Sequence, residues 1–235
     1  MSSSYRFLAL SDHWLARSVR GLYRAVVHFG LPAPRVIVRP WLLLVLGARE
    51  ISHFIQRVFW CEPLFKAYCA EYGKNLRTGI FLHWVQGKGR LTIGDHVTLD
   101  GKSNFIFAVR YSDDPCLEIG SHTGIGHNCA FVVGKKISIG SYCRIAYSVQ
   151  MFDTPGHPMD PEMRKAGLPA RNEDVLPIVI EDNVWIGSSS IIYPGVRIGQ
   201  GSVVAMGSVV MNSVPPNVVV AGNPARQIRA LAKTE

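Results

Sequence analysis

A six-residue period of aliphatic side chains runs through the C-terminal half of the chain and restricts its fold more than any other feature. The period is uninterrupted over Ile180, Ile186, Ile192, Ile198, Val204 and Val210. An α-helix with 3.6 residues per turn cannot keep such a period on one face, and a strand alternates every two residues. The pattern instead predicts a flat-sided solenoid. Each hexad forms a short strand and a corner, and its aliphatic residue points inward.

The same period continues upstream with interruptions. Residues 93–105, 119–131 and 139–151 keep the spacing, whereas the register slips at 111–116 and 134–136, which predicts loops leaving the coil. A longer departure at 153–177 is rich in proline and charged residues and has no six-residue pattern. Long loops on a rigid scaffold commonly carry function. We therefore expect the active site to include this loop.

Several motifs resemble those of the hexapeptide-repeat acyltransferases. They are Asp-Asn-Val-Trp-Ile-Gly at 182–187, Pro-Gly-Val-x-Ile-Gly at 194–199, Gly-Ser-Val-Val at 207–210 and Ala-Gly-Asn-Pro-Ala-Arg at 221–226. Gly-His-Pro-Met-Asp-Pro at 156–161 narrows the resemblance to the sugar O-acetyltransferase branch. That branch includes maltose and galactoside acetyltransferases and acetyltransferases of bacterial polysaccharide synthesis. The resemblance covers about residues 91–231. It implies a left-handed parallel β-helix, a homotrimer, and acetyl-CoA bound in the groove between neighbouring subunits.

The predicted fold class is mainly β, with three parts. Residues 1–75 are expected to form a basic amphipathic helical region. Residues 76–222 form the left-handed β-helix with the excursion loop 153–177, and residues 223–235 form a short C-terminal helix or tail.

Acetyl transfer from a thioester to a hydroxyl needs a base, a donor for the oxyanion and aligned substrates. His157 is the predicted general base, because imidazole titrates near neutrality and the resemblance makes it the catalytic histidine. Asp153 is four residues earlier. It either orients the imidazole, as carboxylates do in catalytic triads, or forms an Asx-type turn before Pro155.

The resemblance also implies the residues that bind the substrates. Asn128 is expected to contact the acceptor sugar and Trp185 to wall the acyl site; a left-handed corner and core or interface packing are the respective alternatives. The resemblance places the oxyanion donor among the amides of residues 186–188. Small residues would let pantetheine approach the backbone, and a cation would bind the nucleotide end. The predicted cofactor-binding residues are Gly187, Ser188, Ala205, Gly207 and Arg226, whereas Arg229 and Lys233 are interpreted as solvated charges of the terminal helix.

The positive charge is concentrated near the N-terminus. The chain carries a net charge of +8, and residues 1–60 contain eight arginines against Asp12 and Glu50. Apolar residues at helical spacing follow Asp12, the expected N-cap, and a second apolar stretch begins at Pro40. Basic amphipathic helices with aromatic residues fit the membrane interface, where an anionic leaflet attracts each arginine by about 1 kcal/mol. We predict that residues 12–60 contact an anionic membrane surface, with packing on the solenoid or in the trimer as the alternative.

Other features restrict the location. No apolar run approaches the roughly 20 residues of a spanning helix, and no signal peptide is expected. Five cysteines without a CxxC pair favour a reducing compartment. The predicted location is cytoplasmic, peripheral on the inner face of the bacterial plasma membrane.

The resulting functional prediction is an acetyl-CoA-dependent O-acetyltransferase with a saccharide acceptor. A soluble acceptor would not require the arginine-rich N-terminus, so a lipid-linked or polysaccharide intermediate at the membrane is expected. A soluble saccharide or small molecule, with the helices serving only trimer assembly, is the alternative. The acceptor's identity, the hydroxyl or amine modified, and acyl groups larger than acetyl stay open.

Three other classes fit the sequence less well. A zinc enzyme like the γ-class carbonic anhydrases needs three converging histidines, and His122 and His127 lack a third, so no metal is expected. A non-catalytic scaffold would leave His157 and the CoA motifs without a role. Nucleic-acid binding is not expected, because the arginines interleave with a membrane-like apolar stripe.

Overall fold

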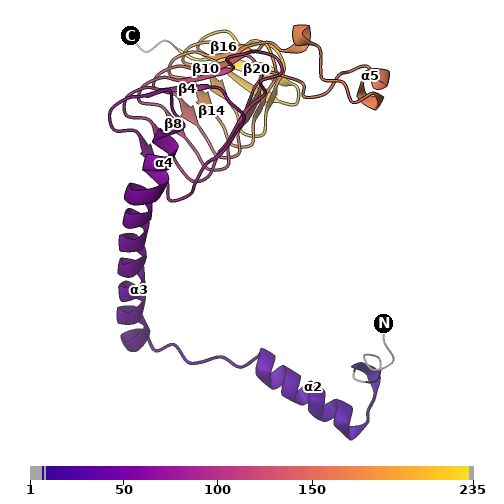
Figure 1. Cartoon of the computed structure of the whole chain (residues 1–235). Helices are drawn as coiled ribbons and strands as arrows, with labels where there is room; N and C mark the ends of the chain where they lie inside the picture. The colour runs from indigo at the N-terminus through magenta and orange to yellow at the C-terminus, as the bar shows by residue number, and fades with distance from the viewer. Residues whose placement is uncertain (1–6, 8, 233–235) are drawn as a thin grey trace. The chain divides into compact units, whose positions relative to one another are not determined.

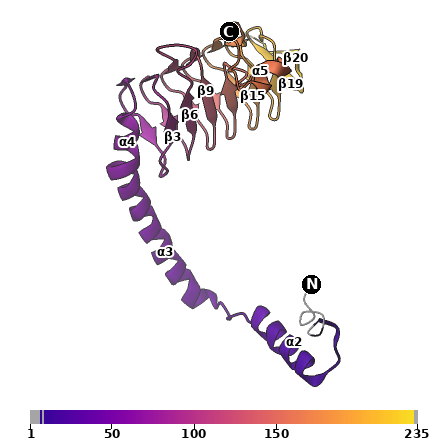
Figure 2. The same cartoon turned by 45° about the vertical axis from the view of Figure 1, so that its right-hand side comes forward.

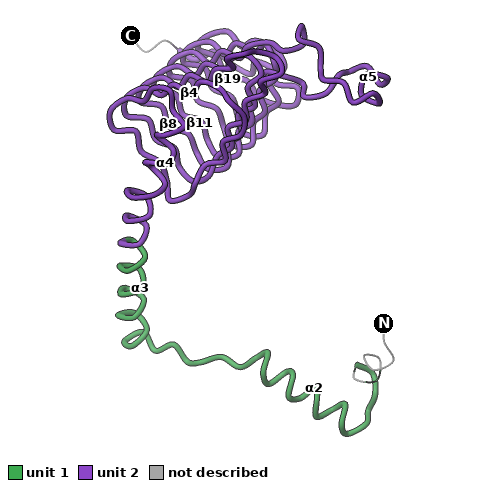
Figure 3. The backbone as a smooth tube through the Cα atoms, in the orientation of Figure 1, with its two compact units in different colours: residues 1–50 green, residues 51–235 purple. Residues whose placement is uncertain are grey.

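The computed structural model describes residue 7 and residues 9–232. The chain divides into two compact units, residues 1–50 and 51–235, which Figure 3 shows in different colours. The first unit contains α2 (Trp14–Val27) and most of α3 (Arg35–Gln56), of which residues 51–56 belong to the second unit. In the described part of the chain, no helix is both long and apolar enough to cross a membrane.

Two details of these helices differ from the sequence-based expectation. The N-cap of α2 is His13, whose Nδ1 accepts a hydrogen bond of 3.3 Å from the Leu15 amide, and Asp12 precedes it. The α3 helix begins at Arg35, five residues before the expected start, with Pro40 inside it. None of the residues of α3, all of which the structure describes, is buried.

The second unit is a parallel β-helix of three sheets, whose coils are stacked in Figures 1 and 2. The first face contains β1 (Glu71–Tyr72), β4 (Arg90–Ile93), β7 (Cys116–Ile119), β10 (Lys136–Ile139), β13 (Ile178–Ile180) and β16 (Arg197–Ile198). The second face contains β2 (Arg77–Thr78), β5 (Thr98–Leu99), β8 (Gly124–Ile125), β11 (Arg144–Ile145), β14 (Trp185–Ile186), β17 (Val203–Val204), β19 (Val218–Gly222) and β20 (Ala225–Ala230). The third face contains β3 (Trp84–Gln86), β6 (Asn104–Phe107), β9 (Ala130–Val133), β12 (Gln150–Phe152), β15 (Ile191–Ile192) and β18 (Val209–Val210).

The six-residue period predicts the core correctly. Each of the six aliphatic residues from Ile180 to Val210 is at most 1% exposed. The parallel register places Ile145, Ile186 and Val204 beside one another on successive coils. Because equivalent residues stack at the same height, one large aliphatic side chain per hexad fills the centre of the interior. The predicted left-handed parallel β-helix is confirmed as the fold class.

The small residue of each hexad also has a defined role. Ser190 and Ser208 are fully buried, and both hydroxyls donate to the Ala205 carbonyl, at 3.1 and 2.6 Å. The Ser202 hydroxyl donates to Pro215 O at 2.7 Å. These bonds satisfy corner carbonyls that no strand neighbour reaches, which a buried polar group requires.

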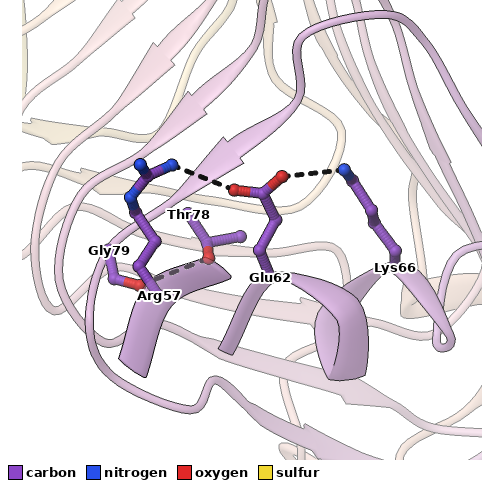
Figure 4. A network of polar contacts seen from close by, with 5 residues as sticks. All are labelled: Arg57, Glu62, Lys66, Thr78 and Gly79. Carbon is purple, nitrogen blue, oxygen red and sulfur yellow. Dashed lines mark hydrogen bonds and ion pairs between the residues drawn. The ribbon is translucent and has the colours of Figure 1, made fainter. Parts of the chain in front are cut away.

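A short helical segment closes the base of the β-helix. It consists of a π-helical turn (Arg57–Cys61) and α4 (Glu62–Lys66), where the Glu62 carboxylate accepts from Arg57 and Lys66 at 3.3 and 2.8 Å (Figure 4). Phe65 is 2% exposed, and its ring lies 4.5 Å from the His83 ring and 5.5 Å from the Phe105 ring, centroid to centroid. The solenoid itself begins at β1, slightly before the predicted boundary at residue 76.

The C-terminal helix predicted for residues 223–235 is wrong. The chain reverses after Gly222, and β20 pairs antiparallel with β19 from Ala225 to Ala230. Pairing with β19 covers what would otherwise be an open sheet edge. Lys233 lies outside the described residues, as do residues 234–235.

Two of the three predicted excursions from the coil are present in the structure. Residues 108–115 leave the coil as predicted, but β10 follows β9 after only two residues, so 134–136 is a tight corner and not an excursion. The loop 153–177 contains α5 (Pro161–Lys165), capped by the Asp160 side chain, and a 3-10 turn (Asn172–Asp174). In Figure 1 the segment with α5 projects away from the coils.

Candidate active site

The predicted base, His157, lies on the loop that leaves the third face after β12. Its side chain is exposed. The backbone on both sides of it is held. The Thr154 hydroxyl accepts from the Gly156 amide at 3.2 Å, and Gly156 has a φ of 78°, which favours glycine. After His157, the Arg164 Nη1 donates to Pro158 O and Met159 O at 2.8 and 2.6 Å. The imidazole is therefore solvent-accessible on a fixed turn.

Asp153 does not orient this imidazole in the structure. It is fully buried, and its carboxylate accepts from three consecutive amides of the preceding coil: Gly134 at 2.5 Å, Lys135 at 2.7 Å and Lys136 at 2.8 Å. Burial raises the pKa of Asp153, and these three hydrogen bonds oppose the rise. Neither sequence-based interpretation of Asp153 is correct, because the hydroxyl of Thr154 forms the turn and both oxygens of Asp153 anchor the corner at 134–136.

The same anchor closes the base of the loop. The Leu176 amide donates to Asp153 O at 2.9 Å, and the Lys135 ammonium donates to Asn172 O at 2.7 Å. Both ends of the excursion are thereby attached to the corner that joins β9 to β10. Neither the Asp153 anchor nor the Arg164 contacts could be found from the sequence alone, since no motif marks them.

The predicted cofactor residues gather at one edge of the β-helix, the second corner. We use this name for the turns between the second and third faces: residues 126–129, 146–149, 187–190 and 205–208. Gly187 and Ser188 lie on one coil, and Ala205 and Gly207 lie on the next. A Cβ atom at Gly187 would be 2.5 Å from the Met206 amide nitrogen, so only glycine allows these coils to approach.

The second corner offers one free backbone donor in the predicted stretch. The Gly187 amide donates to Val204 O at 2.8 Å. The Ser188 amide has no acceptor among the hydrogen bonds of the described residues, while Ser188 O accepts from Gly207 at 2.8 Å. Of the amides at 187 and 188, that of Ser188 is therefore the one free to bind an oxyanion.

Asn128 lies at the same corner, on an earlier coil. Its φ is 61°, so the left-handed corner role is present, and its side-chain amide donates to the Ser148 hydroxyl at 3.2 Å. Trp185 projects outward from β14 and is 55% exposed, which excludes packing in the core of this chain. Both side chains are exposed and can therefore reach a ligand.

Arg226 belongs to β20 and not to a helix. Its side chain is exposed, and Nη1 donates to Ala225 O at 3.0 Å. It pairs with Ala221, whose neighbour Val220 accepts from the Ala205 amide at 2.9 Å. A strand therefore places this cation near the cofactor residues of the second corner.

The structure does not bring His157 to these residues within one chain. His157 follows the third face, whereas the second corner precedes it, so the third face separates the two groups. The histidine pair considered for zinc is also divided, because His122 precedes β8 and His127 follows it. Within residue 7 and residues 9–232, no group of three His, Cys, Asp or Glu side chains could hold a metal ion.

Comparisons with known proteins agree with this architecture. Residues 177–212 match a family described as "Hexapeptide repeat of succinyl-transferase". The galactoside O-acetyltransferase of Escherichia coli is 41% identical over 123 residues, which are 52% of this chain and 58% of that enzyme. The chain spans about half the length of the curated relatives it matches.

Solved structures extend the similarity over more of the chain. A hexapeptide-repeat-containing acetyltransferase of Vibrio cholerae is 31% identical with a TM-score of 0.50, over 73% of this chain and 79% of that one. A Vibrio cholerae O1 biovar eltor acetyltransferase of the same type, solved with acetyl-coenzyme A, shares the fold, with a TM-score of 0.51 and 24% identity over 99% of this chain and 100% of that one. The repeats, their register and these similarities together show that the chain belongs to the hexapeptide-repeat acetyltransferases.

Proposed function

We propose that the protein is an acetyl-CoA-dependent O-acetyltransferase of a saccharide, with His157 as general base. The observation that carries the proposal is the second corner, where small residues on consecutive coils surround the free amide of Ser188. A narrow thioester arm can lie against such a backbone. The acetyl-coenzyme A complex of the Vibrio cholerae protein and the activity in the name of the Escherichia coli relative support this assignment.

The chemistry follows from these groups. The acceptor hydroxyl loses its proton to the His157 imidazole as its oxygen attacks the thioester carbonyl. The Ser188 amide donates to the oxyanion that forms. When the carbon–sulfur bond breaks, the imidazolium returns the proton to the departing CoA thiolate. Trp185 would wall the acyl group, Asn128 would bind an acceptor hydroxyl, and Arg226 would bind the anionic end of CoA.

A homotrimer is part of this proposal. Because the third face separates His157 from the second corner of its own chain, a neighbouring subunit can supply the missing half of the site. In a closed cyclic assembly, one surface of each subunit contacts a different surface of the next subunit.

The test measures CoA thiol release from acetyl-CoA with a panel of saccharide acceptors. His157→Ala should lower acceptor-dependent kcat by about 100-fold or more, the scale of a lost general base. Lys88→Ala, which removes an exposed β-helix side chain outside residues 12–60 and outside the proposed site, is the control. Release that survives the His157 substitution would contradict the assignment of the base, and no release with any soluble or lipid-linked saccharide would contradict the activity.

We further propose that the acceptor is lipid-linked or part of polysaccharide synthesis, and that residues 12–60 contact the cytoplasmic face of the plasma membrane. The α2 and α3 helices expose large apolar side chains, among them Leu22 and Trp41, each 67% exposed. Arg17 and Arg24 are exposed on α2. Apolar and cationic side chains together favour an anionic bilayer surface. Assembly contacts with a soluble acceptor are the alternative.

Co-sedimentation with anionic vesicles separates these two possibilities. The full chain carrying Arg17→Glu and Arg24→Glu should lose vesicle binding, whereas Lys74→Glu with Lys88→Glu, an equal charge change on exposed β-helix residues, should retain it. If neither pair affects binding, or the wild-type chain does not bind, membrane contact through these helices is refuted.

A further inference from the structure

A groove of about 500 Å³ on the second face is left unassigned by the site described above. It extends over four successive coils, from β5 through β8 and β11 to β14. Trp185 stands at one end, and Asp100, His96 and His122 are among the residues that line the rest. The groove therefore begins at the proposed acyl site and continues away from it along the solenoid.

A glycine makes room for a cation in this groove. The parallel register aligns the outward positions Thr98, Gly124, Arg144 and Trp185 in one column. A Cβ atom at Gly124 would be 3.7 Å from both Cδ and Nη1 of Arg144, so the arginine lies over the glycine. Its Nη1 donates to His122 O at 2.7 Å and to Cys143 O at 3.1 Å. These two bonds hold the guanidinium across the groove.

The rest of this guanidinium is available. In the described part of the chain, Nε and Nη2 of Arg144 have no hydrogen bond and no ion pair, and the residue is exposed. Two other outward arginines of the β-helix are neutralised: Arg90 pairs with Asp114 at 3.1 Å, and Arg197 pairs with Glu181. A fixed, unpaired guanidinium is suited to a planar carboxylate or a phosphate, to which it can donate two parallel hydrogen bonds.

Three stacked rings lie along the edge of the groove, at the corner between the first and second faces. His96, His122 and Tyr142 occupy equivalent corner positions with φ between 55° and 60°. Their ring centroids are 4.9 and 4.8 Å apart, and the planes are within 7° and 6° of parallel. Because the rings cover one another's faces, they present their edges, and the imidazole edges can hydrogen-bond to hydroxyl groups.

We propose that this groove is an acceptor subsite that binds the anionic group of an acidic saccharide. The inference rests on the proposed function and specifies its substrate class. Trp185 would stack on the sugar that is acetylated, and Arg144 would hold the carboxylate or phosphate of the adjoining part. The imidazoles and Asp100 would bind hydroxyls. Three strand spacings of about 4.8 Å give the groove a length of about 14 Å, more than one sugar ring needs.

Binding measurements on the full chain test this without requiring acetyl transfer. Saturation-transfer NMR titrations at low salt would use digalacturonate, galactose 1-phosphate and methyl galactoside. The first two probes distinguish a carboxylate from a phosphate as the bound group, and the third is neutral. At least one anionic probe should bind about tenfold more tightly than the neutral one, the size of effect expected for a hydrogen-bonded charge.

The variants assign that preference to one side chain. Arg144→Gln should abolish the preference, Arg144→Lys should retain part of it, and Arg197→Gln on the first face should leave it unchanged. Equal binding of the three probes by the wild type, no binding at all, or a preference that survives Arg144→Gln in a folded variant would overturn the inference. Acetyl transfer to a panel of acidic, neutral and lipid-linked saccharides is measured separately. Its absence with every acceptor, together with a retained anion preference, would count against the proposed function alone.

Discussion

The imidazole of His83 should make the β-helix less stable in mild acid. Burial lowers the pKa of His83 from its ordinary value of 6.5 to about 4. Its Nδ1 accepts from the Ser103 amide at 3.2 Å, and its Nε2 is buried with no hydrogen-bond partner among the described residues. Phe65 and Phe105 pack against the ring. Protonation would place a charge in this apolar cluster and a second donor opposite the Ser103 amide.

The sign and size of the effect follow from linkage. Because the folded pKa is below the unfolded one, the unfolded chain binds this proton more readily, so stability is complete above pH 6.5 and is lost as pH falls toward 4. With about 1.4 kcal/mol for each pH unit between the two pKa values, the full loss is about 3 kcal/mol. At about pH 5 the loss attributable to His83 is about 2 kcal/mol, against almost none at about pH 7.5.

Urea unfolding of the wild type and of His83→Gln at these two pH values measures the effect. Glutamine does not titrate, and it can keep an acceptor near the Ser103 amide. The free energy of unfolding of the variant minus that of the wild type should rise by about 2 kcal/mol from neutral to acid pH. The exposed His127→Gln serves as the control. A difference for His83→Gln that stays within about 0.5 kcal/mol across the two pH values would refute the reasoning.

Three further substitutions test other parts of the structure. Asp153→Asn places an amide group opposite the backbone donors of residues 134–136. It should cost about 3 kcal/mol in urea unfolding, because a buried hydrogen-bonded charge is replaced by a mismatched donor; an unchanged midpoint would show that these bonds do not hold the corner. Gly187→Ala drives a Cβ atom against the Met206 backbone and should destabilise the coil by about 1–3 kcal/mol, whereas Gly124→Ala, whose Cβ atom would meet its nearest neighbour at 3.4 Å, should be nearly neutral; equal melting temperatures of the two variants would contradict the geometry. Arg164→Gln removes the contacts to Pro158 O and Met159 O, so the turn that carries His157 loses its support. The substitution should lower kcat about tenfold or more with little effect on unfolding. Stopped activity assays at saturating acetyl-CoA compare the variant with the wild type.

The repeating parts of the fold could be predicted from the sequence, because the aliphatic residue of each hexad indicates by its spacing that it is buried. Ile186 needs no knowledge of a distant partner to be placed inside. The strand β20 could not be predicted in this way. Its residues alternate poorly, and they form a strand because β19 offers an open edge beside them. In a short terminal segment, pairing with a distant strand can therefore outweigh the local propensity for another secondary structure.

The candidate site divides along the same line. His157, Trp185 and the small residues of the second corner lie in contiguous motifs, so a resemblance could identify them. The partners of Asp153 are 17 to 19 residues earlier, on the preceding coil, and only the folded chain brings them together. The groove beside Arg144 was missed for the same reason. The groove is formed by the stacked rings of the corner and by a column of outward side chains. The six-residue period predicts only which residues point inward, so it says nothing about that column.

The separation of His157 from the second corner leads to a last prediction about assembly. If each site takes its base from one subunit and its acyl groove from the next, two inactive variants can complement each other. His157→Ala lacks the base, and Ala205→Trp should place a bulky ring in the acyl groove at the second corner. In randomly mixed trimers at equal amounts, a boundary works when an intact base faces an intact groove, which occurs at about one boundary in four. Co-expressed variants should therefore regain about a quarter of wild-type CoA release, and activity no higher than that of the separate variants would place the whole site within one chain.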